Sequence, residues 1–227
     1  MSMHLNDNNL SGEIPSLTLC KWLITIDFGD NILQGTLPAW VGHNLHSLIV
    51  FRLRGNKMQG SIPTSLCNLL FLQVLDLSRN NITGEIPQCL SQIFALSNLK
   101  FPRKTIAYNR NGIADGTSSP SSVEEIIIAS KGQNREYRKN LGFMTVIDLS
   151  SNHLTGEMPQ SVTTLMALAG LNLSGNNLTG MIPNNIDHMK CWNHLTCQKT
   201  SFMEKSNKLF KFDFLSYINL SFNNLSG

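Results

Sequence analysis

The side chains that could perform chemistry are few, and they form no known catalytic pattern. Six His and five Cys are spread over the 227 residues. The sequence contains no phosphate-binding loop and no G-x-S-x-G or H-E-x-x-H motif. Cys191, His194 and Cys197 are spaced closely enough to suggest zinc, but no fourth ligand is evident. We therefore predict that the chain is not an enzyme and that it holds neither a metal nor a cofactor.

Charged side chains are the remaining candidates for a functional site. The formal net charge of +3 is too small to indicate a nucleic-acid-binding surface. In the first half of the chain, acidic and basic residues recur about 24 positions apart, and a mixed-charge patch suits a peptide or protein ligand. The alternative is a solvated face whose charges pair with one another. The candidate contacts are Asp27, Asp30, Arg52, Arg54, Asp76 and Arg79.

Neither the cysteines nor the apolar residues identify a cellular compartment. The number of Cys is odd and their spacing is wide, which does not indicate a disulfide framework. The first ten residues have no basic start and no apolar run, so we predict no signal peptide. No stretch approaches the roughly 20 apolar residues of a membrane helix. Six N-x-S/T sequons become glycosylation sites only in the secretory route: Asn9, Asn81, Asn172, Asn177, Asn219 and Asn224.

The elements that must position these side chains belong to a repeat. The chain holds 32 Leu and 25 Asn, and both types recur in units such as QVLDLSRNNITGEIP (73–87) and AGLNLSGNNLTGMIP (169–183). Such self-similarity predicts a solenoid of stacked units. Each unit contains one Asn at a fixed place, and these residues are Asn8, Asn31, Asn56, Asn80, Asn152, Asn176 and Asn223.

Each position of the unit has a structural reason. The apolar pair before each Asn, such as Leu75 and Leu77, alternates with polar residues, which predicts a strand with one buried face. Stacking of the units places these strands in a parallel sheet. The Asn is predicted to bond the backbone of its own bend and of the next coil. The polar residues between the apolar positions are then expected to form columns on one open face.

The repeat resembles the plant-type extracellular leucine-rich repeat. The resemblance is carried by the pattern L-x-x-L-x-L-x-x-N-x-L-x-G-x-I-P and covers all the chain except about 45 residues. It implies an α/β solenoid with a parallel β-sheet on the concave face. It also implies a piece of a cell-surface protein that binds an extracellular peptide or protein ligand and a co-receptor kinase, in defence or developmental signalling. Membrane attachment would come from segments outside this chain.

The interruption at 97–142 is similar to the island of plant receptor-like proteins and receptor kinases. Its centre, GTSSPSS (116–122), predicts a loop, and its second half has strand-like and basic character. The phrase KGxxxEY at Lys131–Tyr137 looks most like the kinase-lacking receptor-like proteins of plant immunity. Lys131 and Tyr137 are therefore further contact candidates.

A second departure from the repeat occurs at residues 191–213. The spacing between Asn176 and Asn223 leaves room for one more unit, but the Leu/Asn pattern is lost there. We explain it by a local frameshift, because a shifted reading can restore DLSKN in the expected register; the alternative is a divergent loop. The predicted organisation is four repeats at 1–96 (the first partial), the island at 97–142, two repeats at 143–190, the degenerate repeat at 191–213 and a partial repeat at 214–227.

Three other functions remain open. The chain could be part of the ectodomain of a leucine-rich-repeat receptor kinase. It could be a secreted inhibitor of cell-wall-degrading enzymes, although the relatives of that class usually lack an island. It could also be the product of a truncated, non-functional gene.

Overall fold

The computed structural model describes residues 1–98, 107–108, 122–123, 126–130, 133–137, 145–186 and 217–226. The chain divides into two compact units. The first comprises Met1–Leu99 with Thr145–Gly227, and the second comprises Lys100–Met144. The first unit contains the repeats and the second contains the island.

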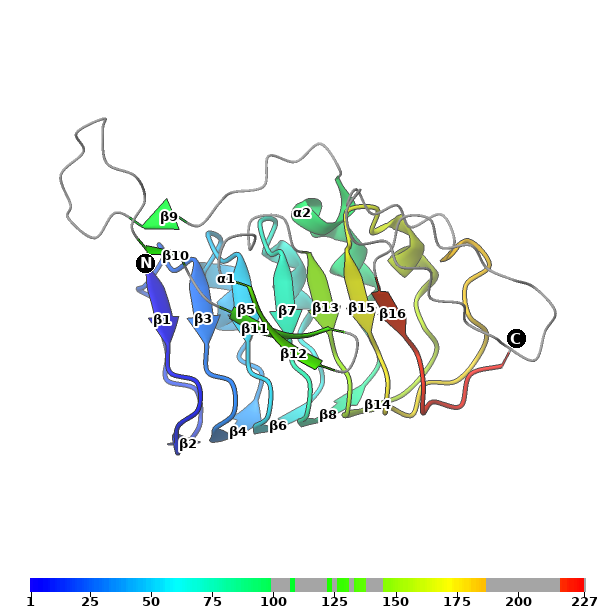
Figure 1. Cartoon of the computed structure of the whole chain (residues 1–227), viewed down its shortest axis with the longest axis horizontal. Helices are drawn as coiled ribbons and strands as arrows, with labels where there is room; N and C mark the ends of the chain where they lie inside the picture. Colours follow the sequence, from blue (N-terminus) through cyan, green and yellow to red (C-terminus); the bar gives the residue numbers. More distant parts are fainter. Residues whose placement is uncertain are drawn as a thin grey trace. The chain divides into compact units, whose positions relative to one another are not determined.

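The repeats build a seven-stranded parallel sheet, in which the strands stand side by side in chain order (Figure 1). The middle residue of each strand points into the core, as at Ile26, Phe51 and Leu75, which are at most 1% exposed. Leu75 and Leu77 belong to the apolar core, whereas Asp76 between them pairs with Arg52 of the neighbouring strand, so the predicted alternation is present although all three are buried. The strands are β1 (Ser2–His4), β3 (Thr25–Asp27), β5 (Val50–Arg52), β7 (Val74–Asp76), β13 (Val146–Asp148), β15 (Gly170–Asn172) and β16 (Tyr217–Asn219).

A second parallel sheet and a row of short helices complete each coil. The second sheet follows the Asn-containing bend of each unit and contains β2 (Ser11–Gly12), β4 (Ile32–Thr36), β6 (Lys57–Gly60), β8 (Asn81–Gly84) and β14 (His153–Leu154). The helices close the far side of the coil with buried residues such as Leu66 and Leu90. They are α1 (Trp40–Asn44), η1 (Thr64–Asn68), η2 (Gln88–Gln92), α2 (Phe94–Ser97) and η4 (Gln160–Thr164). The predicted α/β solenoid is confirmed.

Asparagine side chains join each coil to the preceding one. Asn80 Nδ2 donates to the carbonyls of Leu77 at 3.1 Å and Ser78 at 3.1 Å in its own bend, and to Leu53 at 2.9 Å in the preceding coil. Its Oδ1 accepts the backbone N–H of Met58 at 2.9 Å. Because the side chain lies inside the coil, no water can replace these bonds. The same arrangement is present at Asn31, Asn56, Asn152, Asn176 and Asn223, and Asn8 bonds the carbonyls of its own bend.

The solenoid continues directly across the island. Strand β13 pairs with β7, so that Ile147 stands opposite Leu75 and Asp148 opposite Asp76. Asn152 extends the asparagine series across the junction by donating to the Leu77 carbonyl at 3.0 Å. The island is therefore an insertion in the sequence between two coils that are adjacent in the stack. Within the island unit, β9 (Ala107–Tyr108) pairs with β10 (Ser122–Val123), and β11 (Ile126–Ser130) pairs with β12 (Gln133–Tyr137), both antiparallel.

The coils before and after residues 191–213 are adjacent in the stack. Strand β16 pairs with β15, with Leu171 opposite Ile218. Asn223 Oδ1 accepts the N–H of Leu178, a bond between adjacent coils. The spacing of 47 residues therefore does not correspond to two stacked units. The segment for which we proposed a frameshift, 191–213, lies outside the described residues.

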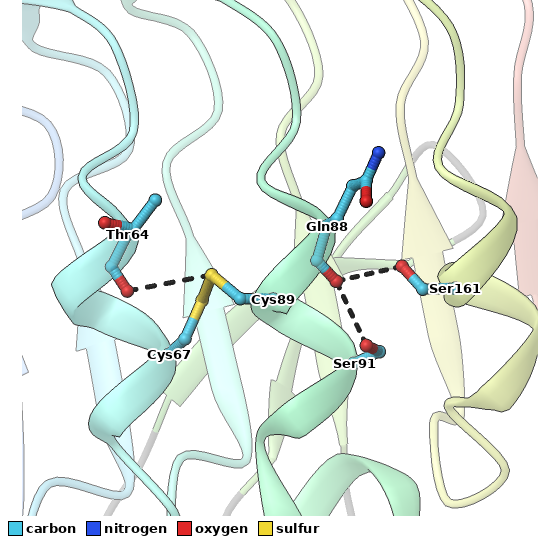
Figure 2. Close-up of a disulfide and its surroundings, with 6 residues drawn as sticks. All are labelled: Thr64, Cys67, Gln88, Cys89, Ser91 and Ser161. Atoms are coloured by element: carbon cyan, nitrogen blue, oxygen red, sulfur yellow. Dashed lines mark hydrogen bonds between the residues drawn. A yellow bond between two sulfur atoms is a disulfide. The ribbon is translucent and has the colours of Figure 1, made fainter.

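A disulfide connects two adjacent helices on the far side of the coil. Cys67 in η1 and Cys89 in η2 are bonded, with their Cα atoms 5.7 Å apart (Figure 2). The Gln88 carbonyl accepts the Ser161 hydroxyl of η4 at 2.9 Å, so the three helices are connected in a row. This corrects the expectation drawn from the odd number of Cys. The positions of the two cysteines could have indicated this bond, because both lie in the short turn that follows a G-x-I-P motif, in neighbouring coils.

Loss of this disulfide is expected to lower the free energy of unfolding by about 3 kcal/mol, because the bond closes a loop of 22 residues in the unfolded chain. The measurement is urea denaturation of the Cys67→Ser/Cys89→Ser double variant. Cys20→Ser is the matched control, because Cys20 is a free, half-buried thiol. A double variant as stable as this control would contradict the expectation.

Candidate functional site

The polar residues of the seven-stranded sheet form a column in register. Adjacent strands pair so that His4, Asp27, Arg52, Asp76, Asp148, Asn172 and Asn219 stand opposite one another in that order. The column predicted from the repeat is therefore present. Its charged part covers β3, β5, β7 and β13, and its last two positions are neutral.

Arg52 is the centre of a group of carboxylates. Its Nη1 lies 3.1 Å from Asp27 Oδ2, its Nε lies 3.3 Å from Asp76 Oδ2, and its Nη2 lies 3.8 Å from Asp30 Oδ2. Burial by itself would lower the pKa of the guanidinium, but Asp27, Asp76 and Asp30 more than compensate and the pKa is raised. Arg52 is therefore permanently charged and connects three strands of the sheet. We call Asp27, Asp30, Arg52 and Asp76 the Arg52 cluster.

Two glycines make room for the cluster. A Cβ on Gly29 would lie 3.5 Å from Arg52 Cζ and 3.2 Å from Asp27 Oδ1. A Cβ on Gly55 would lie 2.3 Å from Asp30 Oδ1, and Gly55 also has a positive φ of 66°. Sequence reasoning did not single out either residue. For Gly29 the signal would have been its column, in which the later members Ser78, Ser150, Ser174 and Ser221 are all Ser.

The cluster corrects the expectation that all of these charges lie on an open face. Arg52 and Arg54 are only 4% and 6% exposed, and Asp27 and Asp76 are also buried. Arg54 Nη1 donates to Ser78 Oγ at 3.1 Å. The partners of Arg52 and Arg54 are side chains of neighbouring strands.

Two of the candidate residues do reach the surface. Asp30 is half-buried and Arg79 is exposed, and each precedes the Asn of its bend with a positive φ, 51° and 54°. That backbone conformation turns the side chain out of the strand direction. Of the island candidates, Lys131 lies outside the described residues, and Tyr137 is the last residue of β12.

Asp76 has an unusual protonation equilibrium. Burial, followed by repulsion from Asp148 on the next strand, raises the pKa of Asp76 to about 6. The bond from Ser78 and the charges of Arg52 and Arg54 act in the opposite direction. These attractive interactions do not offset the effect of burial and of Asp148 on the pKa, because Arg52 is shared with the carboxylates of Asp27 and Asp30.

This equilibrium gives an expected pH dependence. The pKa of Asp76 is higher in the folded than in the unfolded chain, so its contribution to stability is full below pH 4 and is lost as the pH rises through 6. The loss is on the order of 3 kcal/mol. Asp76→Asn should therefore show a flatter dependence of the free energy of unfolding between pH 4 and 7, measured by urea denaturation. Parallel curves for the variant and the wild type would contradict this.

The column after the island has a uniform pattern of hydrogen bonds. Asp148 Oδ1 accepts both the N–H and the hydroxyl of Ser150, at 3.0 and 2.6 Å. Asn172 and Asn219 accept the same pair of bonds from Ser174 and Ser221. Asn172 Nδ2 also donates to Asp148 Oδ2 at 3.0 Å. These side chains satisfy one another, so this part of the face acts as a scaffold.

Among the described residues there is no group of three or more His, Cys, Asp or Glu that could hold a metal ion. The helices described there are all too short or too polar to cross a membrane. Cys191, His194 and Cys197 lie outside the described residues.

Comparison with known proteins identifies the repeats. Residues 47–69, 71–93, 143–165 and 167–189 match the family model Leucine Rich Repeat. The chain is 35% identical over 167 residues to Receptor-like protein EIX2 of Solanum lycopersicum. That alignment covers 69% of this chain and 15% of EIX2, so the chain spans about a seventh of this relative.

Solved structures show the same architecture. One is the ectodomain of the Arabidopsis thaliana receptor kinase GASSHO1/SCHENGEN3, solved in complex with CASPARIAN STRIP INTEGRITY FACTOR 2. It matches this chain with a TM-score of 0.66 and 27% sequence identity. The match covers 100% of this chain and 19% of that ectodomain. The Arabidopsis receptor kinase HAESA, in complex with the peptide hormone IDA and the co-receptor SERK1, has a TM-score of 0.53 at 25% identity. It covers 100% of this chain, which covers 34% of it. The chain therefore belongs to the leucine-rich-repeat proteins and, among them, to the plant receptor-like proteins.

Proposed function

We propose that this chain is a ligand-recognition region of a plant cell-surface receptor-like protein. In this proposal the seven-stranded face binds a peptide or protein ligand, and signalling proceeds through a partner receptor kinase in defence or development. The observation that carries the proposal is the Arg52 cluster with exposed Arg79 beside it. The chain's own role is binding without catalysis.

The cluster supports recognition because it holds charges in fixed places before any ligand arrives. The buried Arg52 guanidinium pairs with the half-buried carboxylate of Asp30 and restrains its position. Gly55 has no side chain and therefore leaves the space that Asp30 occupies. A preorganised charge loses little side-chain entropy on binding, and complementary charges select the partner. Asp30 and Arg79 are then the direct contacts, and Arg52 and Arg54 position their neighbours. Lys131 and Tyr137 of the island remain proposed contacts.

The disulfide supports an extracellular location. Disulfides persist in oxidising compartments and are rare in the cytosol. The Cys67–Cys89 bond is formed between adjacent coils that are already held together by their strands and asparagines. This geometry suits a protein that folds in the secretory route and works outside the cell.

A receptor-kinase ectodomain is the second candidate. It is favoured by the solved neighbours GASSHO1/SCHENGEN3 and HAESA, which are receptor kinases. Both candidates assign the same binding role to the seven-stranded face. A kinase-coding stretch in the same gene would select this second candidate.

The binding proposal can be tested with a displayed library of random peptides selected against the whole chain. The peptides recovered should slow amide hydrogen exchange in the bends after β3, β5 and β7, which contain Asp30, Gly55 and Arg79. Slowed exchange confined to the helices η1 and η2 would contradict the proposal. So would the recovery of no binding peptide.

A further inference from the structure

Four of the six sequons occupy one equivalent position on the solenoid. Asn9, Asn81, Asn177 and Asn224 each directly follow the Asn that stands at the fixed place of its repeat unit. Asn81 begins β8 of the second sheet, and all four are exposed. Asn177 and Asn224 continue the same side of the coil, because their N–H groups donate to Leu154 and Leu178 of the preceding coil. The four therefore lie along one lateral flank.

The local backbone presents the whole sequon outward. In Asn81–Ile82–Thr83 the outer residues are exposed, whereas Ile82 is 1% exposed and packs in the core. Asn177 and Thr179 are likewise exposed around the fully buried Leu178. Extended backbone places the first and third side chains on the same side. Within the described residues, the side-chain amides of Asn81 and Asn177 have no hydrogen-bond partner, so both sequon side chains are accessible.

The other two sequons, at Asn172 and Asn219, lie on the seven-stranded sheet and not on the lateral flank. Asn172 is in the column of the seven-stranded sheet and is 7% exposed. Its Nδ2 donates to Asp148 Oδ2 at 3.0 Å and to Ser150 Oγ at 3.1 Å. The sequon hydroxyl of Ser174 donates back to Asn172 Oδ1 at 2.8 Å. Asn219 and Ser221 repeat this last bond at 2.7 Å.

We propose that N-linked oligosaccharides are attached at Asn9, Asn81, Asn177 and Asn224, and that Asn172 and Asn219 stay unmodified in the folded protein. The inference rests on the proposed extracellular function, because the modification occurs in the secretory route. Nδ2 bonds to C1 of the first sugar of an oligosaccharyl diphosphate lipid; the lipid diphosphate leaves, and one amide proton is released. At Asn172 the sugar would displace the bond to Asp148 and enter the recognition face.

The distribution divides the solenoid into two surfaces. Sugars on the flank of the second sheet would cover β8 and the coils on either side of it. The seven-stranded face keeps its hydrogen-bonded asparagines and remains free of sugar. A protein partner would therefore be excluded from that flank and admitted to the face that contains the Arg52 cluster.

The test is site-by-site glycan occupancy on the whole chain, secreted from a eukaryotic host behind an added signal sequence. Enzymatic removal of glycans in H₂¹⁸O converts each occupied Asn to labelled Asp, which peptide mass spectrometry locates. We expect labelled Asp at positions 9, 81, 177 and 224 and none at 172 or 219. Label at Asn172 in the secreted protein, or an unlabelled Asn81, would overturn the inference.

Matched variants separate this outcome from misfolding and from the binding proposal. Thr83→Ala keeps Asn81 but destroys its sequon, so it should lose one glycan, whereas Ser174→Ala should lose none. A loss of one glycan in Ser174→Ala would also overturn the inference. Peptide binding is measured separately: an occupied flank with no peptide binding would contradict the proposed function alone, and peptide binding with an empty flank would contradict this inference alone.

Discussion

Replacing Arg52 with methionine is expected to lower the free energy of unfolding by about 3–5 kcal/mol. The variant keeps the aliphatic bulk of the side chain but leaves Asp27 and Asp76 buried without their cation. Removing one partner of a buried ion pair leaves an uncompensated charge, which is the reason for the large effect. The measurement is urea denaturation followed by circular dichroism at neutral pH.

The control for this prediction is Arg79→Met, because Arg79 is exposed. Its effect should stay within about 0.5 kcal/mol, as is usual for surface substitutions. In the double variant Arg52→Met/Asp27→Asn, part of the loss should be recovered, because one of the unpaired charges is removed. Equal stabilities of the Arg52 and Arg79 variants would show that the cluster does not hold the strands together.

Replacing Asn80 with alanine is expected to lower the free energy of unfolding by about 4 kcal/mol. The side chain satisfies the carbonyls of Leu53, Leu77 and Ser78 and the N–H of Met58. Each buried polar group that loses its partner costs about 1–3 kcal/mol. The loss would separate two adjacent coils, because two of these four bonds cross between them.

The neighbouring residue provides the control for this second prediction. Asn81→Ala changes the same residue type one position later, where the side chain is exposed. Measured on unglycosylated protein, it should change stability by no more than about 0.5 kcal/mol. A pair of variants with equal urea midpoints would contradict the structural role of the asparagine series.

The regular part of the fold could be predicted because its determinants are local. The pattern around Leu75, Leu77 and Asn80 specifies a strand and a bend within one unit, and repetition specifies the parallel sheet. The alignment of the residues from Asp27 to Asp148 in one column could be predicted from the same repeat register. No long-range information was needed for these features, since every unit contacts a copy of itself.

The remaining features depend on contacts that spacing does not encode. The burial of Arg52 requires Gly29 and carboxylates from the two neighbouring strands and the bend after β3, which is a property of the assembled sheet. The spacing of 47 residues between Asn176 and Asn223 does not by itself show that their coils are adjacent, which the pairing of β15 with β16 establishes. The Cys67–Cys89 bond was missed because the cysteines were judged by count instead of by their place in the repeat.

The central claim is that the face containing the Arg52 cluster is the recognition surface, and one affinity comparison tests it most directly. A peptide selected against the wild-type chain is titrated against Arg79→Glu and against Lys57→Glu. The two variants make the same change of charge, but Lys57 is exposed on the lateral second sheet. The account predicts at least about tenfold weaker binding for Arg79→Glu and little change for Lys57→Glu. Equal affinities of the two variants would contradict it.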